Sequence, residues 1–314
     1  MQENIINLIK KSRGTVDYKI SHYPDGQTDI ELGEINLKWP VRIICRIRNA
    51  EELFMLRMVS SVLKDMHARI KNIDIMYLMA ARTDRKFSWN RPCTLDIVIN
   101  DIRFLGAEYV NVYEPHNYSA VFNLCSGSDG SVVSPISYIP NEGTGSYPDL
   151  FFELKDHSLG TDYEINPETT YLVAPDEGAR DRMKDDVRYH GYRILYCRKN
   201  RDPRTGRIQS VELCGNADNS NVEGKNLLVV DDLSDRGGTF LALINVLRRY
   251  GAKMIGLCIS HCIQDDGLKD LAKAYDFVAT TDSYKDWNHI VEEDPESYPN
   301  VLVCKLKYRP YTKE

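Results

Sequence analysis

Short apolar runs alternate with amphipathic stretches along the first half of the chain. The first helix is predicted by four apolar residues at helical spacing: Leu53, Leu56, Val59 and Leu63. Asn49 and Glu52 form a capping box at its start. Residues 73–80 and 109–113 read as strands, and a second apolar stripe over residues 95–105 predicts the helix between them.

The second half has the same alternation. Strands are predicted at residues 170–174, 194–197, 227–230 and 254–260, and helices at 178–189 and 239–250. Alternating strands and helices favour an α/β fold with a largely parallel sheet. The 314 residues correspond to about two domains, and we place their boundary near residue 160, which gives domains 1–160 and 161–314.

Composition narrows the class of protein. Hydrophobic residues make up 42% of the chain and charged residues 27%, and the formal charge is −6, so we expect neither a basic nucleic-acid binder nor a disordered chain. No apolar run approaches the roughly 20 residues that span a bilayer, and the start has no signal-peptide pattern. The 8 cysteines are scattered, which favours free thiols in the cytoplasm. Cys258, His261 and Cys262 match no usual zinc spacing.

The most informative segment is a buried strand that runs into two acids and a glycine turn. Residues 227–230 supply the strand, and the candidate binding residues that follow are Asp231, Asp232, Asp235, Arg236, Gly237, Gly238 and Thr239. Glycines let the backbone approach an anion, and the free amides of the next helix point toward it. The two carboxylates suit the hydroxyls of a ribose. An Asp-rich turn without a ligand is the alternative.

This segment resembles the phosphoribosyl-diphosphate (PRPP) motif of type I phosphoribosyltransferases and ribose-phosphate diphosphokinases. Over most of its length the chain is similar to a diphosphokinase. That resemblance implies two similar phosphoribosyltransferase-like domains, each a mostly parallel sheet flanked by helices. It also implies that the first domain carries the ATP loops, and the second the diphosphate loop, the flap and the ribose-phosphate loop.

Two N-terminal segments resemble the family's ATP loops. The first is an aromatic residue followed by Asp-Gly-Gln, where the family has Asp-Gly-Glu, and the second, at residues 81–86, is similar to Ala-Arg-Gln-Asp-Arg-Lys. The resemblance assigns ATP binding to Tyr23, Asp25, Gln27, Arg82, Thr83, Asp84, Arg85 and Lys86. In the family the first loop reaches the nucleotide of a neighbouring subunit, which implies a homo-oligomer. A hairpin tip and a solvated basic turn are the alternative readings.

Three further segments complete the resemblance. The diphosphate loop would consist of Asp176, Glu177, Gly178 and Arg182, with Ala179 in place of a second glycine. Lys199 and Arg201 match the Lys-x-Arg of the catalytic flap, where cations would stabilise the charge of the transferring group. His116 stands where the family has Asp-Leu-His, and with Asp176 it would hold Mg²⁺.

The departures from the family concern the acceptor. Arg236 replaces a threonine in the phosphate loop, Asn90 and Arg91 replace Arg-Glu, the 125–168 segment is long, and no amphipathic C-terminal helix is expected. Ribose 5-phosphate is the default acceptor, and ADP-ribose, as in an NAD-salvage pyrophosphokinase, is the alternative because arginine binds phosphate oxygens well. A phosphoribosyltransferase and a non-catalytic regulatory paralogue also remain open.

Overall fold

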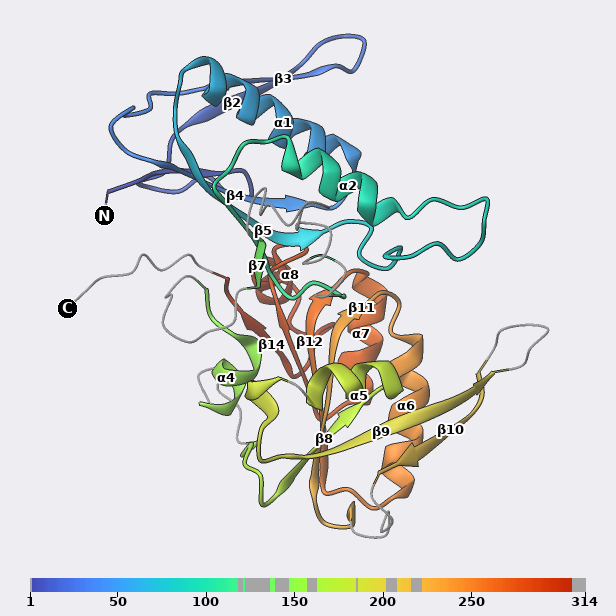
Figure 1. Cartoon of the computed structure of the whole chain (residues 1–314). Coiled ribbons are helices and arrows are strands. Elements are labelled where there is room, and N and C mark those ends of the chain that lie inside the picture. Colours follow the sequence, from blue (N-terminus) through green and yellow to red (C-terminus); the bar gives the residue numbers. More distant parts are fainter. Residues whose placement is uncertain are drawn as a thin grey trace. The chain divides into compact units, whose positions relative to one another are not determined.

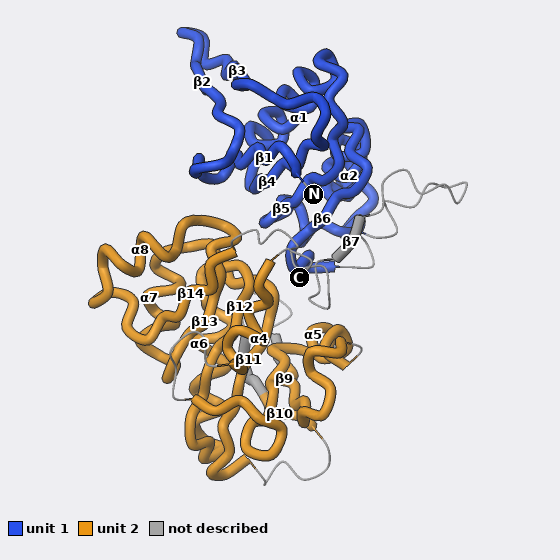
Figure 2. Tube along the Cα trace, turned by 90° about the vertical axis from the view of Figure 1, so that its left-hand side faces the viewer, with its two compact units in different colours: residues 1–140 blue, residues 141–314 orange. Residues whose placement is uncertain are grey.

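The computed structural model describes residues 2–117, 121, 136–138, 147–156, 163–184, 186–201, 208–215 and 222–306, with the backbone alone at 136–138, 199–201 and 208–211. The chain divides into two compact units, Met1–Pro140 and Asn141–Glu314 (Figures 1 and 2). The division falls before the expected boundary near 160. Helix α4 (Leu150–Lys155) explains the difference, because it buries Leu150, Phe151 and Leu154 in a core cluster of the second unit.

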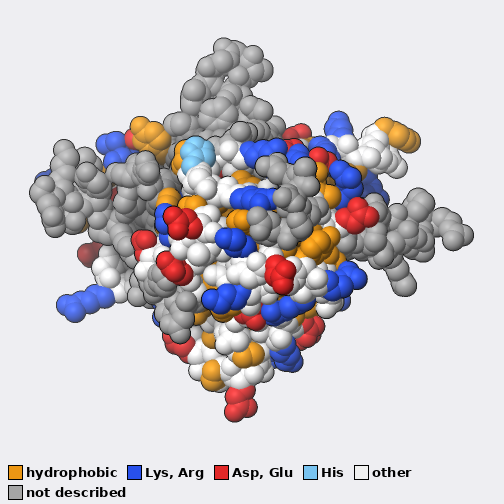
Figure 3. All heavy atoms as spheres, turned by 90° about the horizontal axis from the view of Figure 1, so that it is seen from below, with side chains coloured by type: hydrophobic (Ala, Val, Ile, Leu, Met, Phe, Trp, Pro, Cys, Tyr) orange, Lys and Arg blue, Asp and Glu red, His pale blue; other side chains and the backbone are white. Residues whose placement is uncertain are grey.

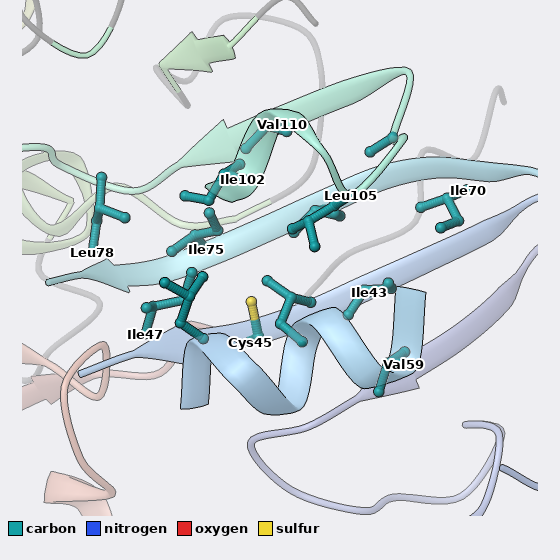
Figure 4. Packing of buried hydrophobic residues seen from close by; sticks show 14 of the residues in the cluster. Ile43, Cys45, Ile47, Val59, Ile70, Ile75, Leu78, Ile102, Leu105 and Val110 are labelled. Atoms are coloured by element: carbon teal, nitrogen blue, oxygen red, sulfur yellow. The ribbon is translucent and has the colours of Figure 1, made fainter. Parts of the chain in front are cut away.

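The first unit is built on a parallel sheet with the strand order β1-β4-β5-β6-β7. These strands are β1 (Asn4–Asn7), β4 (Val41–Ile47), β5 (Ile70–Leu78), β6 (Tyr109–Val112) and β7 (Ile136–Tyr138). Helices α1 (Ala50–Asp65) and α2 (Thr94–Arg103) share one hydrophobic core with the sheet (Figure 4). The hairpin β2 (Tyr18–His22)–β3 (Thr28–Leu32) contacts α1 through its second strand.

Half of the predicted capping box is present at the start of the first helix, because Asn49 caps it while Glu52 bonds to the backbone of Arg48 rather than to that of Asn49. The side chain of Asn49 accepts a hydrogen bond from the backbone N–H of Glu52 at 2.9 Å, and Glu52 accepts one from the backbone N–H of Arg48 at 2.6 Å. The four apolar positions predicted to face the core are buried there. The predicted strand at 73–80 is β5, which begins earlier and ends at Leu78.

The second unit has a seven-stranded sheet in the order β10-β9-β8-β11-β12-β13-β14, parallel except for β10. Its strands are β8 (Thr170–Ala174), β9 (Arg193–Arg201), β10 (Ile208–Cys214), β11 (Asn226–Ser234), β12 (Met254–Cys262), β13 (Phe277–Thr281) and β14 (Val301–Cys304). Its helices, besides α4, are α5 (Glu177–Lys184), α6 (Gly238–Arg249), α7 (Asp265–Ala274) and α8 (Trp287–Glu293).

Two core clusters show that helices cover this sheet on both faces. Side chains of α4 and α5 pack in one cluster, and side chains of α6, α7 and α8 pack in the other. The central strands are therefore buried on both faces, which explains their continuous apolar runs. The α/β class with mostly parallel sheets flanked by helices is confirmed.

One helix prediction needs correction. The helix expected at 178–189 is α5 followed by a short 3₁₀ turn (Val187–Tyr189), which starts where Asp186 accepts a hydrogen bond from the backbone N–H of Arg188. The tail contains α8 ahead of its last strand β14, and the expectation about a C-terminal helix concerns residues 307–314, which lie outside the described residues. Asp286 caps α8, and the fully buried Trp287 anchors it in the core.

Candidate active site

The carboxyl ends of β8 and β11 bring acidic residues together in the second unit. These two strands are parallel neighbours, so the segments that follow them meet at one edge of the sheet. Asp176 comes two residues after β8, and its carboxylate accepts a hydrogen bond from the backbone N–H of Ala179 at 3.0 Å, which caps α5. Asp231 and Asp232 lie in the last part of β11 and are largely buried.

Arg182 connects the two segments. One guanidinium nitrogen lies 3.3 Å from a carboxylate oxygen of Asp231 and 3.4 Å from one of Asp232, although the residues are 49 and 50 positions apart in sequence. A Cβ placed on Gly178 would lie 3.5 Å from Asp176 Oδ1 and 3.9 Å from Arg182 Nη1, so both side chains flank this glycine. The structure therefore joins the predicted diphosphate loop to the predicted ribose acids.

The charge of this cluster is finely balanced. Burial raises the pKa of Asp231 well above its usual range, and the neighbouring Asp232 raises it further through charge repulsion and hydrogen bonding. The guanidinium of Arg182 and the backbone N–H of Asp232, which donates to Asp231 at 3.0 Å, act in the opposite direction. Arg182 thus favours the ionised carboxylates that accept hydrogen bonds from hydroxyl groups.

The glycine turn after β11 leads directly into α6. Gly237 caps the helix with φ 73°, a left-handed conformation that glycine adopts without strain. Nothing lies within 4 Å of a Cβ placed on Gly238, so a ligand can approach the backbone there. Thr239 follows in the first turn, where free amides attract an anion. Arg236 is exposed and forms no hydrogen bond or ion pair with the described residues.

In the first unit, the segments after β5 and β6 are tied together. Asn117 donates a hydrogen bond from its amide to the carboxylate of Asp84 at 2.6 Å. Both segments begin at a residue with positive φ that is not glycine, 63° at Ala80 and 42° at Glu114. Such strained positions concentrate at functional sites. The sequence did not single out Asn117, although it directly follows the matched His116.

The remaining residues of this loop have local partners. The side chain of Thr83 donates to the backbone carbonyl of Ala80 at 2.9 Å, and the guanidinium of Arg85 lies 5.3 Å from the ring centre of Phe87. Arg82, Arg85 and Lys86 are exposed at the carboxyl end of the sheet. That arrangement suits a polyphosphate ligand, which cations bind through its oxygens.

The other predicted ATP loop, at residues 23–27, is the turn of the β2–β3 hairpin. Asp25 accepts a hydrogen bond from the backbone N–H of Gln27 at 3.0 Å, and Gly26 has φ 87°. This turn leaves the ring of Tyr23 53% exposed. In Figure 1 the tip of the hairpin projects from the unit apart from the loop that follows β5.

Lys199 and Arg201 lie in the outer part of β9. The inner part, Arg193 to Tyr196, pairs with β8, whereas Lys199 pairs with Val211 and Arg201 with Ile208 of the antiparallel β10. The pair therefore belongs to a two-stranded arm, consistent with the expected hairpin. Their side chains and residues 202–207 lie outside the described residues.

Metal binding can be considered for the described residues only. They contain no group of three or more His, Cys, Asp or Glu side chains arranged for a metal ion. Cys258 and Cys262 pack in different core clusters, and His261 lies 2.7 Å from the hydroxyl of Ser283, so these residues form no zinc site. Mg²⁺ commonly binds through one or two carboxylates together with substrate phosphates and waters, and Asp176, Asp231 and Asp232 fit that donor set.

The surface charges, the helices and the cysteines bear on which partners the chain can have. Figure 3 shows cationic and anionic side chains interspersed over one face of the molecule. In the part of the chain that the structure describes, every helix is too short or too polar to traverse a bilayer. The cysteines described are free thiols.

This chain is similar to known proteins that carry a phosphoribosyl transferase domain or are named ribose-phosphate pyrophosphokinase. The phosphoribosyl transferase domain model matches residues 161–296. A ribose-phosphate pyrophosphokinase of Sulfolobus acidocaldarius is 25% identical over 259 residues, covering 81% of this chain and 79% of that relative. The enzyme of the same name from Pyrococcus furiosus is 24% identical and covers 88% of both chains.

A solved structure has the same fold. The phosphoribosylpyrophosphate synthetase of Mycobacterium smegmatis superimposes with a TM-score of 0.72 at 17% sequence identity, covering 96% of this chain and 95% of that one. The likeness therefore extends over both units and not only over the segment matched by the domain model.

Proposed function

Since these matches support a divergent member of the ribose-phosphate pyrophosphokinase family, we propose that this chain transfers the β,γ-diphosphoryl group of ATP to ribose 5-phosphate. The attacking group is the anomeric 1-hydroxyl of the sugar, and the products are PRPP and AMP. The observation that carries the proposal is the acid pair Asp231 and Asp232, held by Arg182 beside the glycine turn of α6.

The sugar phosphate would bind along this edge of the second unit. Ionised Asp231 and Asp232 accept hydrogen bonds from the ribose hydroxyls. The 5-phosphate lies against the amides of Gly238 and Thr239, where open space above the backbone permits close contact. The hydroxyl of Thr239 adds a donor to the same phosphate. Asp235 completes this loop.

ATP would bind to the first unit's loops. Arg82, Arg85 and Lys86 provide cations for the triphosphate, and Thr83 and Asp84 shape the loop that carries them. Tyr23 offers an exposed ring to the adenine, with Asp25 and Gln27 beside it. We propose that this hairpin serves the nucleotide of a neighbouring copy, so that the active protein is a homo-oligomer.

Transfer needs positioning and cations rather than a side-chain nucleophile. The sugar hydroxyl attacks the β-phosphorus, the bond from that phosphorus to the α-phosphate oxygen breaks, and AMP leaves. Lys199 and Arg201 stabilise the charge that spreads over the transferring oxygens. Bound Mg²⁺ supplies further charge neutralisation; His116, Asp176 and the diphosphate loop at Glu177 and Gly178 are the groups assigned to hold the ion and the diphosphate. The free thiols of the described cysteines suit a reaction in the cytoplasm.

Product analysis tests the reaction. The protein is incubated with ATP, Mg²⁺ and a panel of ribose phosphates, and the nucleotide and sugar products are separated and weighed by mass spectrometry. AMP and a diphosphorylated sugar in equal amounts support the proposal. ADP as the stoichiometric nucleotide product contradicts it. Asp231→Asn should abolish most turnover in the same assay.

A second acceptor is favoured by Arg236. Its exposed guanidinium has no partner among the described residues and stands in the loop assigned to the 5-phosphate. Guanidinium binds phosphate oxygens in a bidentate manner, which suits a ribose with a second phosphate at this end, such as ADP-ribose. The panel above therefore includes ADP-ribose. A non-catalytic paralogue would give no product with either sugar.

A further inference from the structure

Helix α7 packs directly against the turn between β11 and α6. A Cβ placed on Gly267, in the first turn of α7, would lie 2.7 Å from the carbonyl oxygen of Asp235. The same Cβ would lie 2.9 Å from the carbonyl carbon and 2.9 Å from the Cα of Arg236. All three contacts are backbone atoms, so no flexible side chain can turn aside to make room. Any residue larger than glycine must therefore displace the turn or the helix.

The same helix supports the turn at a second point. A Cβ on Gly237 would lie 3.0 Å from Cγ of Leu271 and 3.2 Å from the carbonyl oxygen of Gly267. Leu271 is fully buried in the core shared with α6. Residues 235–237 are thus packed on α7 at two positions about one helical turn apart, and this contact defines where the amides of α6 point.

We infer that Gly267 is a positioning residue for the binding of the phosphate group on the 5-position of a ribose at the turn of residues 235–239. The inference rests on the proposed function, since that function makes this turn the sugar-phosphate loop. Gly267 touches no substrate. It acts by letting α7 approach the backbone of Asp235 and Arg236 closely enough to hold the loop in its binding conformation.

Helix propensity and loop position predict opposite results for Gly267→Ala. Alanine is the better helix former. If the glycine had no packing role, its replacement by alanine would make α7 more stable and leave ligand binding unchanged. At Gly267 the new methyl group instead pushes the loop by several tenths of an ångström. Such a displacement should weaken sugar-phosphate binding about tenfold, because binding of this kind depends on sub-ångström placement.

Calorimetric titration of the full chain tests the inference. Wild type, Gly267→Ala and the control Asp270→Ala are each titrated with ribose 5-phosphate, ADP-ribose and ATP. Asp270 is an exposed residue of the same helix, and its replacement by alanine also improves helix propensity, by slightly less than that of a glycine. We expect Gly267→Ala to bind the sugar phosphates about tenfold more weakly, to bind ATP within threefold of wild type, and the control to match wild type.

The outcomes separate this inference from the proposed function. Sugar-phosphate affinity of Gly267→Ala within twofold of wild type overturns the inference and leaves the function standing. A wild-type protein that binds neither sugar phosphate overturns both. If Gly267→Ala does not fold, Leu271→Ala takes its place, since it removes the support under Gly237. Unchanged sugar-phosphate binding in that variant then overturns the inference.

Discussion

The two regions assigned to the two substrates are built differently. On the sugar side, Arg182 contacts Asp231 and Asp232, and the glycine turn is packed on a buried helix. On the nucleotide side, the cations of the 82–86 loop are exposed and the ring of Tyr23 points away from the core. A site whose side chains already contact one another is complete within one chain. An exposed set of side chains acquires its geometry only from its ligand or from another copy.

The largest expected effect tests whether the arm of β9 and β10 supplies the catalytic cations. Lys199→Ala and Arg201→Ala should each lower kcat about 100- to 1,000-fold, because a cation that acts on developing charge is lost mainly from the transition state. Nucleotide affinity should stay within a few-fold. Steady-state kinetics measures both. Arg198→Ala, an exposed neighbour on the same strand, is the matched control and should retain turnover.

A mixing experiment tests whether the nucleotide region depends on a second copy. Tyr23→Ala and Lys199→Ala variants are each nearly inactive, and they are combined at equal concentration under conditions that allow subunit exchange. If Tyr23 serves a neighbouring chain in a symmetric dimer, half of the dimers are mixed and each has one intact site, so about a quarter of wild-type activity should return. If the active protein sediments as a monomer, Tyr23 does not serve the nucleotide of a neighbouring chain, and the nucleotide region does not depend on a second copy.

A pH profile tests the completeness of the sugar region. The pKa of Asp231 is already raised, and Arg182 acts to lower it. Arg182→Gln should therefore raise that pKa further. On acidification, the variant should lose activity at a higher pH than wild type does. The variant should also be less stable than wild type when Asp231 is ionised, and this deficit should shrink as the pH falls through the raised pKa.

The control for this profile is a second arginine of the same helix. Arg180 pairs with Glu177 and Asp181 and stacks on Tyr196, and it forms no hydrogen bond or ion pair with the acid pair. Arg180→Gln should lose activity at the same low pH as wild type. Equal pH profiles for Arg182→Gln and wild type would show that the acids do not depend on Arg182 for their charge.

A smaller effect is expected from the link inside the nucleotide region. Asn117→Ala removes the hydrogen bond to Asp84, and a hydrogen bond to a charged group contributes about 1.5–3 kcal/mol where it is buried. Since this bond is only partly buried, we expect KM for ATP to rise about fivefold while KM for the sugar is unchanged. Asn100→Ala, on the exposed face of α2, is the control. A rise in both KM values would mean that Asn117 stabilises the fold rather than the loop.

Features with a local sequence pattern could be predicted from the sequence, whereas contacts between distant residues could not. The helix at Leu53–Leu63 and the strand before Asp231 were predicted because their apolar periodicity is local. The segment 41–47 was not singled out, although it forms β4, an interior strand of the sheet between β1 and β5. Contacts between distant positions, such as Asn117 with Asp84, have no local signal because sheet pairing creates them.

Some residues of the sugar region could be predicted from the sequence and others could not. The order of strand, acids and glycine turn predicted a phosphate site from local chemistry, and the resemblance supplied the diphosphate loop. Gly267 could not be found in this way. Its helix has an ordinary amphipathic pattern, and the reason for a glycine there is the backbone of Asp235 and Arg236, about thirty positions earlier in the sequence.

The smallest expected effect decides the acceptor. Arg236 is the one departure from the family that lies inside the sugar region, and its guanidinium is exposed, so water screens its attraction for a second phosphate. We expect Arg236→Thr to lower kcat/KM for ADP-ribose about fivefold relative to ribose 5-phosphate, which corresponds to about 1 kcal/mol. Competition between the two sugars in one reaction measures this ratio directly. The control is Arg249→Thr, at a cation in the last turn of α6, far along the helix from the phosphate loop. This variant should leave the ratio of the two kcat/KM values unchanged. If Arg236→Thr also leaves the ratio unchanged, the guanidinium does not read the acceptor, and the choice between the two sugars must depend on residues outside the phosphate loop.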